Sequence, residues 1–186
     1  MSVFKDGDVS LTVVWEHSTS GLLGRYALAN AGRARLLVFD RLYQTTVVGS
    51  RVVDPELAWR WLEPDGIYRV AKFVPQVPAG RKVESPEFPY ARLLEPQSRL
   101  TGTVLLPARL DQLRPYDEPA ALAAVAKISG IVLTLGFAEI DDQAKAHPIG
   151  DENDPAYSLV FDWAMTRQRL ISSDVTSLQI AMQAPR

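Results

Sequence analysis

Apolar and polar residues alternate along this chain from one end to the other. The alternation recurs over residues 9–17, 99–106 and 157–163, and in the first of these the apolar positions are Val9, Leu11, Val13 and Trp15. Successive side chains of a β-strand point to opposite faces, so a period of two places one apolar face against a core and leaves the other face toward water. The pattern therefore predicts a chain that is mostly antiparallel β-sheet.

Turn-forming residues divide the chain at short intervals, since it holds 13 prolines and 11 glycines. We predict strands over 9–17, 24–30, 35–43, 45–53, 57–63, 67–74, 90–95, 98–106, 128–140, 157–165, 168–174 and 177–183. Glu63-Pro64-Asp65-Gly66 predicts a tight turn, because Pro presets φ and Gly supplies a positive φ, so 57–63 and 67–74 should form a hairpin. Asn30-Ala31-Gly32 likewise predicts a turn that closes 24–30 onto 35–43.

One segment departs from the alternation. Asp117-Glu118-Pro119 is followed by an alanine-rich run to Lys127, which predicts a short helix over 117–127. The number of short strands and the turn spacing favour an all-β, immunoglobulin-like sandwich of two antiparallel sheets with this one helix. No convincing linker divides the chain, so we expect a single β-sandwich domain over 1–186.

Composition and charge narrow the function classes. The net charge is −2 and the 20 Lys and Arg residues are scattered, which argues against nucleic acid as a partner because such binding needs a concentrated basic surface. The chain has no Cys, which excludes disulfides, zinc sites built on Cys and thiol nucleophiles. The N-terminus lacks the basic start and apolar run of a signal peptide, and no apolar stretch is long enough for a membrane helix. We therefore expect a soluble, cytoplasmic protein.

The acidic residues of segment 139–154 form the sharpest local cluster. Its candidate ligands are Glu139, Asp141, Asp142, His147, Asp151, Glu152, Asn153 and Asp154. Calcium takes six to eight oxygen ligands, and clustered carboxylates and amides supply them. The run 151–154 resembles the calcium-binding linker of cadherin repeats, and 39–42 resembles their second acidic motif, although Leu42 stands where that motif ends on a carboxylate. A solvated loop is the competing interpretation.

Other motifs carry less chemistry. His17 lies beside Ser18 and Ser20, but neighbours in a strand do not bring a nucleophile and a base together, and the Gly-x-Ser-x-Gly elbow is absent. Segment 21–24 has neither the third Gly of a dinucleotide fingerprint nor the Lys of a phosphate-binding loop. Two Pro-x-x-Pro stretches, 75–78 and 86–89, favour connections between sheets over recognition by SH3-like domains.

Trp59 and Trp61 are two positions apart, so they share one face of the predicted strand 57–63, with Leu57 on the same face. Aromatic side chains usually serve the core. An exposed face of this kind would instead bind a protein partner or stack on sugar rings. We favour the core for this pair.

Two hypotheses for function follow. The first is a non-enzymatic protein-interaction or accessory module that binds an unidentified protein partner, or a second copy of itself, through a sheet edge or an aromatic face. The second is a calcium-dependent binder or enzyme that uses Asp141, Asp142, His147, Asp151 and Asp154. We favour the first, and we assign no catalytic, cofactor-binding or metal-binding residue and no cofactor.

Overall fold

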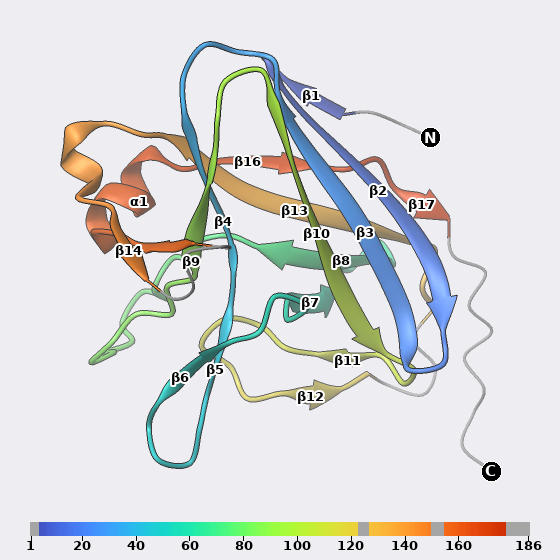
Figure 1. Ribbon diagram of the computed structural model, residues 1–186. Coiled ribbons are helices and arrows are strands. Elements are labelled where there is room, and N and C mark those ends of the chain that lie inside the picture. The colour runs from blue at the N-terminus through green and yellow to red at the C-terminus, as the bar shows by residue number, and fades with distance from the viewer. Residues whose placement is uncertain (1–3, 123–126, 150–154, 178–186) are drawn as a thin grey trace.

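The computed structural model describes residues 4–122, 127–149 and 155–177 of the chain, and these residues are mostly β-strand (Figure 1). The strands are β1 Phe4–Asp6, β2 Val9–Ser18, β3 Gly21–Asn30, β4 Leu36–Arg41, β5 Tyr43–Thr45, β6 Arg51–Val53, β7 Trp59–Leu62, β8 Ile67–Lys72, β9 Tyr90–Leu94, β10 Ser98–Pro107, β11 Asp111–Gln112, β12 Ala120–Ala121, β13 Gly130–Glu139, β14 His147–Ile149, β15 Ala156–Ser158, β16 Arg169–Ser172 and β17 Thr176–Ser177. The described residues also form one α-helix, α1 Phe161–Arg167, and a short 3-10 helix, η1 Asp142–Ala144.

Two large sheets organise the molecule. The first has the antiparallel order β1-β2-β3-β10, and the second has the order β14-β15-β9-β4-β13-β8-β7, with β16 and β17 also paired to β13. Figure 1 shows β2, β3 and β10 side by side, crossing the direction of β8 and β13. The β8–β13 pair is parallel, whereas the other pairs between described strands are antiparallel. The predicted all-β class is confirmed, but the second sheet is not antiparallel throughout as predicted, because β8 and β13 run parallel. The immunoglobulin-like sandwich stays a prediction.

The second sheet is covered on both faces. In β4, Leu36 and Val38 belong to the core that also holds Leu11 and Leu28 of the first sheet. Leu37 and Phe39 point to the other face, where a second core contains Trp163 and Ala164 of α1. The molecule therefore has three layers: the first sheet, the second sheet and the helix.

This layering explains the composition of the central strands. β4 and most of β13 are buried without alternation, because neighbours pack on both of their faces. In β2 the apolar residues alternate, as predicted, with Leu11 fully buried and Thr12 partly exposed. The hairpin predicted at 57–63 and 67–74 is confirmed, since β7 pairs antiparallel with β8.

The helix lies elsewhere than predicted. Ala120–Ala121 form β12, which pairs with β11, so the helix expected over 117–127 is wrong in its described part, and residues 123–126 lie outside the described residues. Part of the predicted strand 157–165 is instead α1, where Ala164 and Met165 follow Phe161 at helical spacing on the second core. The segment fits both a period of two and a helical period, and burial of this face against the second core favours the helix.

Two smaller strand predictions are also wrong. Segment 45–53 is not one strand, because Thr45 and Arg51 are paired across a turn in the hairpin β5–β6. The Asn30 turn does not close 24–30 onto 35–43, since β3 pairs with β2 and β10 while β4 pairs with β9 and β13. Segment 31–35 instead carries the chain from one sheet to the other. The Asn30 side chain, which is 3% exposed, donates to the carbonyls of Ala34 and Glu95 and accepts from the Gly32 amide.

Gly102 of β10 faces Tyr26 of β3 in the register of the first sheet. A Cβ added to Gly102 would overlap the hydroxyl and ring of Tyr26. Gly102→Ala should therefore lower the free energy of unfolding by about 1–3 kcal/mol through overpacking. Urea denaturation checks this value, with Thr101→Ala at the exposed neighbouring position as a control that should change little. Equal stabilities for the two variants would contradict the close packing of Tyr26.

Candidate functional site

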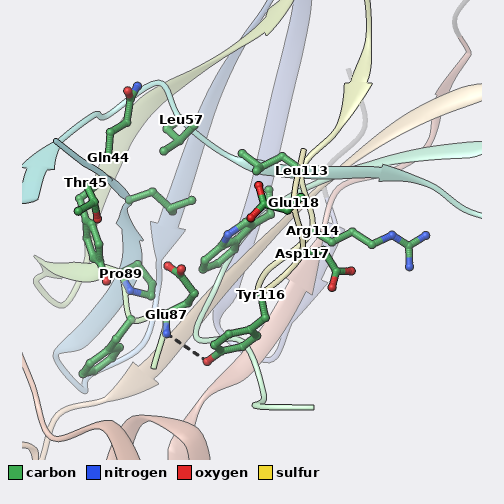
Figure 2. A pocket seen from close by; sticks show the side chains of 14 residues that line it. Gln44, Thr45, Leu57, Glu87, Pro89, Leu113, Arg114, Tyr116, Asp117 and Glu118 are labelled. Carbon is green, nitrogen blue, oxygen red and sulfur yellow. Dashed lines mark hydrogen bonds between the residues drawn. The ribbon is translucent and has the colours of Figure 1, made fainter. Parts of the chain in front are cut away.

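A cleft of about 550 Å³ lies between the hairpin β5–β6, the loop before β9 and the segment that follows β11. Its lining residues are Leu42, Tyr43, Gln44, Thr45, Leu57, Trp59, Glu87, Phe88, Pro89, Leu113, Arg114, Tyr116, Asp117 and Glu118. Figure 2 shows Glu87, Pro89 and Tyr116 on one side of this space and Leu57, Leu113 and Glu118 on the other. A space of this size fits a small molecule or a few side chains of a partner.

Aromatic rings form much of the wall. Trp59 is 6% exposed, belongs to neither core cluster and has its ring centroid 5.5 Å from that of Phe73. Tyr43 packs at a tilt on Tyr90, with ring centroids 5.6 Å apart. Phe88 meets the ring of Phe161 edge-on at 5.6 Å. Contacts behind these rings hold them in place, so the wall is formed before any ligand binds.

Tyr116 has a backbone conformation that is unusual for a bulky residue. Its φ is +66°, in the left-handed region. Its hydroxyl accepts a hydrogen bond from the Glu87 amide at 3.1 Å, which Figure 2 marks with a dashed line. Burial raises the pKa of Tyr116, so the hydroxyl stays protonated near neutral pH. The contact ties the segment after β11 to the loop before β9 and fixes the width of the cleft.

Carboxylates outnumber cations around the cleft. Asp117 pairs with Arg81 at 3.2 Å, and the Arg114 guanidinium lies 5.9 Å from the centre of the Trp61 ring. Figure 2 shows the side chain of Arg114 directed away from the cleft and those of Glu87 and Glu118 directed into it. Neither glutamate has an ion-pair partner among the residues that the structure describes. The interior of the cleft is therefore negative.

The hairpin β5–β6 borders the cleft and projects from the molecule (Figure 1). Asp54 anchors its base, because its carboxylate accepts from Gln44 Nε2 at 2.7 Å and from the amides of Glu56 and Leu57. Arg51 lies 4.5 Å from the centre of the Tyr43 ring. Four valines of the hairpin are exposed beside polar residues such as Thr45, Ser50 and Arg51, with Val47 fully exposed and Val48 86% exposed.

A second group of polar residues lies buried between the two sheets. Arg92 holds the Asp40 carboxylate through two hydrogen bonds, at 3.1 Å and 2.5 Å, and the Tyr26 hydroxyl donates to the same carboxylate at 2.7 Å. Burial by itself would raise the pKa of Asp40, but the hydrogen bonds and charge of Arg92, helped by Lys72, hold it below its ordinary value. Asp40 therefore remains ionised inside the protein.

Lys72 completes this group. Its ammonium donates to the carbonyls of Pro55 at 2.5 Å, Thr103 at 3.0 Å and Asp40 at 3.4 Å. Its position is fully buried, and burial lowers the pKa of Lys72 to about 8 against the opposing charge of Asp40. Strongly shifted groups often mark active sites. Here Asp40 and Lys72 have no exposed surface and lie on hydrogen bonds between sheets, so we assign them to the fold.

Lys72→Met should lower the free energy of unfolding by about 3 kcal/mol at pH 7, because three buried carbonyls lose their donor. The pH dependence has a definite sign. The folded chain releases the Lys72 proton near pH 8, whereas the unfolded chain keeps it up to the ordinary pKa of 10.5. The unfolded chain then binds more protons, so rising pH favours the folded wild type in this window. Urea titrations of wild type and Lys72→Met from pH 7 to pH 9 should show that the difference between their free energies of unfolding increases with pH. A difference that decreases would contradict the lowered pKa of Lys72.

Of the residues of the predicted calcium site, the structure describes Glu139, Asp141, Asp142 and His147. Asp141 begins η1, and its carboxylate accepts from the amides of Gln143 and Ala144 and from Trp163 Nε1 at 2.8 Å. Asp142 and His147 are exposed, while Asp151 and Asp154 lie outside the described residues. The described residues contain no group of three or more acidic, His or Cys side chains that could hold a metal ion. Asp40, from the second acidic motif, is in the buried group described above. The calcium hypothesis stays a prediction.

Asp141→Ala should lower the melting temperature with or without added calcium, because the capping bonds and the partner of a buried tryptophan are lost. The expected cost is about 1–2 kcal/mol. Thermal melts in EDTA and in calcium measure it, with Asp142→Ala as the exposed neighbouring control. A loss that occurs only when calcium is present would show that Asp141 is a metal ligand.

The structure also shows where the remaining sequence motifs lie. His17 is exposed near the end of β2, and the Ser18 hydroxyl donates to the Gly21 carbonyl across the β2–β3 turn. Pro89, which ends the second Pro-x-x-Pro stretch, is buried and lines the cleft. Of the two tryptophans predicted in the core, Trp59 is buried but lines the cleft, and Trp61 is only partly buried. The sequence interpretation missed the cleft, because its walls come from segments far apart in the chain.

The chain matches no family model, no curated protein and no solved structure. No helix among the described residues is long and apolar enough to cross a membrane.

Proposed function

We propose that this chain is a non-enzymatic protein-interaction module that binds an extended segment of a partner protein along the hairpin β5–β6. The observation that carries the proposal is the apolar surface of this hairpin. Val47, Val48, Val52 and Val53 are 106%, 86%, 55% and 37% exposed. Clustered exposed apolar side chains on a soluble domain are typical of binding surfaces.

The turn of the hairpin supports this interpretation. Val47 and Val48 occupy the central positions of a turn closed by a bond of 2.9 Å from the Gly49 amide to the Thr46 carbonyl. Turns favour Gly, Asn, Asp and Pro at such positions, whereas β-branched residues are better suited to strands. The two valines contribute nothing to the core, so their local cost is best explained by a contact with another molecule.

The backbone of the hairpin also suits a partner strand. Thr46 bonds to Ser50 and Asp54 bonds to Leu42 across the hairpin. The alternation of an antiparallel pair then directs the N–H and C=O groups of Thr45 and Val53 to the outer edges. No described strand pairs with either edge, since β5 and β6 form a two-stranded sheet. An extended segment could add to such an edge through backbone hydrogen bonds.

The wider frame of the proposal is a single, immunoglobulin-like β-sandwich domain over 1–186 that acts in the cytoplasm without cofactor or nucleic acid. Two packed sheets support the sandwich, and the dispersed basic residues support the exclusion of nucleic acid. In this proposal the partner is a different protein. The experiment below distinguishes such a partner from a second copy of this chain.

Replacing Val47 and Val48 together by Asp should weaken partner binding by about tenfold or more, because two apolar contacts are lost and charge is placed in the interface. A matched control replaces two exposed valines elsewhere, Val14 and Val175, by Asp. Circular dichroism first confirms that both variants fold. Affinity capture from the lysate of the native organism, with quantitative mass spectrometry, then compares wild type and the two variants.

We expect to find a protein that wild type and the Val14/Val175 control retain and that V47D/V48D does not. Equal retention by all three would move the interface away from the hairpin. Sedimentation of the purified chain tests the other occupant, because a dimer that V47D/V48D converts to monomer would identify a second copy as the partner. A folded, monomeric bait that retains nothing would overturn the proposal.

A further inference from the structure

We infer that the cleft beside the hairpin is a specificity pocket for a basic side chain, with arginine the best fit, of the segment that binds β5–β6. The inference rests on the proposed function and names the chemistry of the partner. Its starting point is the position of the cleft, because Tyr43, Gln44 and Thr45 of β5 form one of its walls. A segment lying along β5 would direct alternate side chains toward this wall.

The charge of the cleft identifies the side chain. Glu87 and Glu118 extend into the space from opposite sides (Figure 2). Neither has an ion-pair partner among the described residues, and the nearby Asp117 is already matched by Arg81. Glu87 is partly buried and Glu118 is exposed. Two unmatched carboxylates that face one cleft favour a cation, because a cationic donor forms charge-assisted hydrogen bonds with both. An acidic or neutral side chain would leave both carboxylates without compensation.

The aromatic walls favour arginine over lysine. Trp59 and Tyr116 line the cleft with their rings, and the raised pKa of Tyr116 keeps its hydroxyl neutral. A planar guanidinium stacks on such rings and donates to two carboxylates at once, whereas an ammonium is a strongly hydrated point charge. The Tyr116 hydroxyl, held by the Glu87 amide, keeps one wall and one carboxylate in a fixed relation.

The size and lining of the cleft also suit an arginine side chain. The cleft volume of about 550 Å³ exceeds that of one arginine, so room remains for flanking residues of an extended segment. The pocket is lined by Leu57 and Leu113 as well, which would contact the methylene stem. The partner segment is therefore expected to place apolar residues on the valines of the hairpin and a basic residue in the cleft.

Isothermal titration calorimetry with blocked pentapeptides tests this inference. The probes share the sequence Thr-Val-X-Val-Thr, where X is arginine, lysine or citrulline, the neutral isostere of arginine; arginine amide alone is a fourth probe. The protein variants are Glu87→Gln/Glu118→Gln and, as a matched control, Glu139→Gln at the exposed end of β13. We expect the arginine peptide to bind about tenfold or more tightly than the citrulline peptide, because charge-assisted bonds are lost with citrulline.

The expected pattern is that E87Q/E118Q removes the preference for arginine while E139Q retains it. Equal binding of the arginine and citrulline peptides, or no binding of either by the folded wild type, would overturn the pocket. Arginine amide that binds as tightly as the peptide would also overturn it, by showing a site for a small cation. The V47D/V48D variant separates the two proposals: arginine preference with unchanged capture of the cellular partner would leave the pocket standing and remove the hairpin function.

Discussion

The fold depends on a buried ionic group that joins its two sheets. The outer edge of β10 is not covered by a described strand, but three of its backbone groups have partners. Arg92 donates to the Thr101 carbonyl at 2.9 Å, Lys72 donates to the Thr103 carbonyl, and the Leu105 amide donates to the Glu56 carbonyl. Asp40 supplies a negative charge that opposes those of Arg92 and Lys72. Unsatisfied strand edges invite aggregation and buried polar groups are costly. Here Arg92 and Lys72 of the second sheet reduce both costs, because their largely buried side chains bond to two edge carbonyls of the first sheet.

The double burial of the second sheet has its own origin in the sequence. β4 carries apolar side chains on both faces, and its pairing with β9 shifts register between Val38 and Arg41, where Asp40 turns toward Tyr26. Such an irregularity re-aims a side chain at the end of a regular ladder. The first core ends at this point and the ionic group begins, so a single local irregularity marks the boundary between apolar packing and charge pairing.

Much of the strand pattern could be predicted, because alternation reports directly on a half-buried sheet. The alternation over 9–17 and 99–106 located β2 and β10, and the Pro64-Asp65-Gly66 turn located the β7–β8 hairpin. Sequence patterns could not settle α1, where strand and helix periods coexist and burial of Ala164 decides between them. The Asn30 turn was also beyond reach, since its side chain bonds to Glu95, far along the chain. The cleft joins residues 42–45, 57–59, 87–89 and 113–118, a juxtaposition that only tertiary pairing creates. Its local signals were Trp59 and the Pro-x-x-Pro stretch 86–89, which we predicted to lie in the core and in a connection between sheets, respectively.

The hydrogen bond from Lys72 to the Pro55 carbonyl carries a consequence for recognition. Pro55 directly follows Asp54, which anchors the base of the hairpin, so the projecting ribbon is tied through two successive residues to the ionic group between the sheets. A ribbon anchored in this way is preorganised and loses little conformational entropy when a partner binds. Rigid surfaces of this kind associate at similar rates with related partners, and selectivity among those partners would therefore be expressed in how slowly each one leaves.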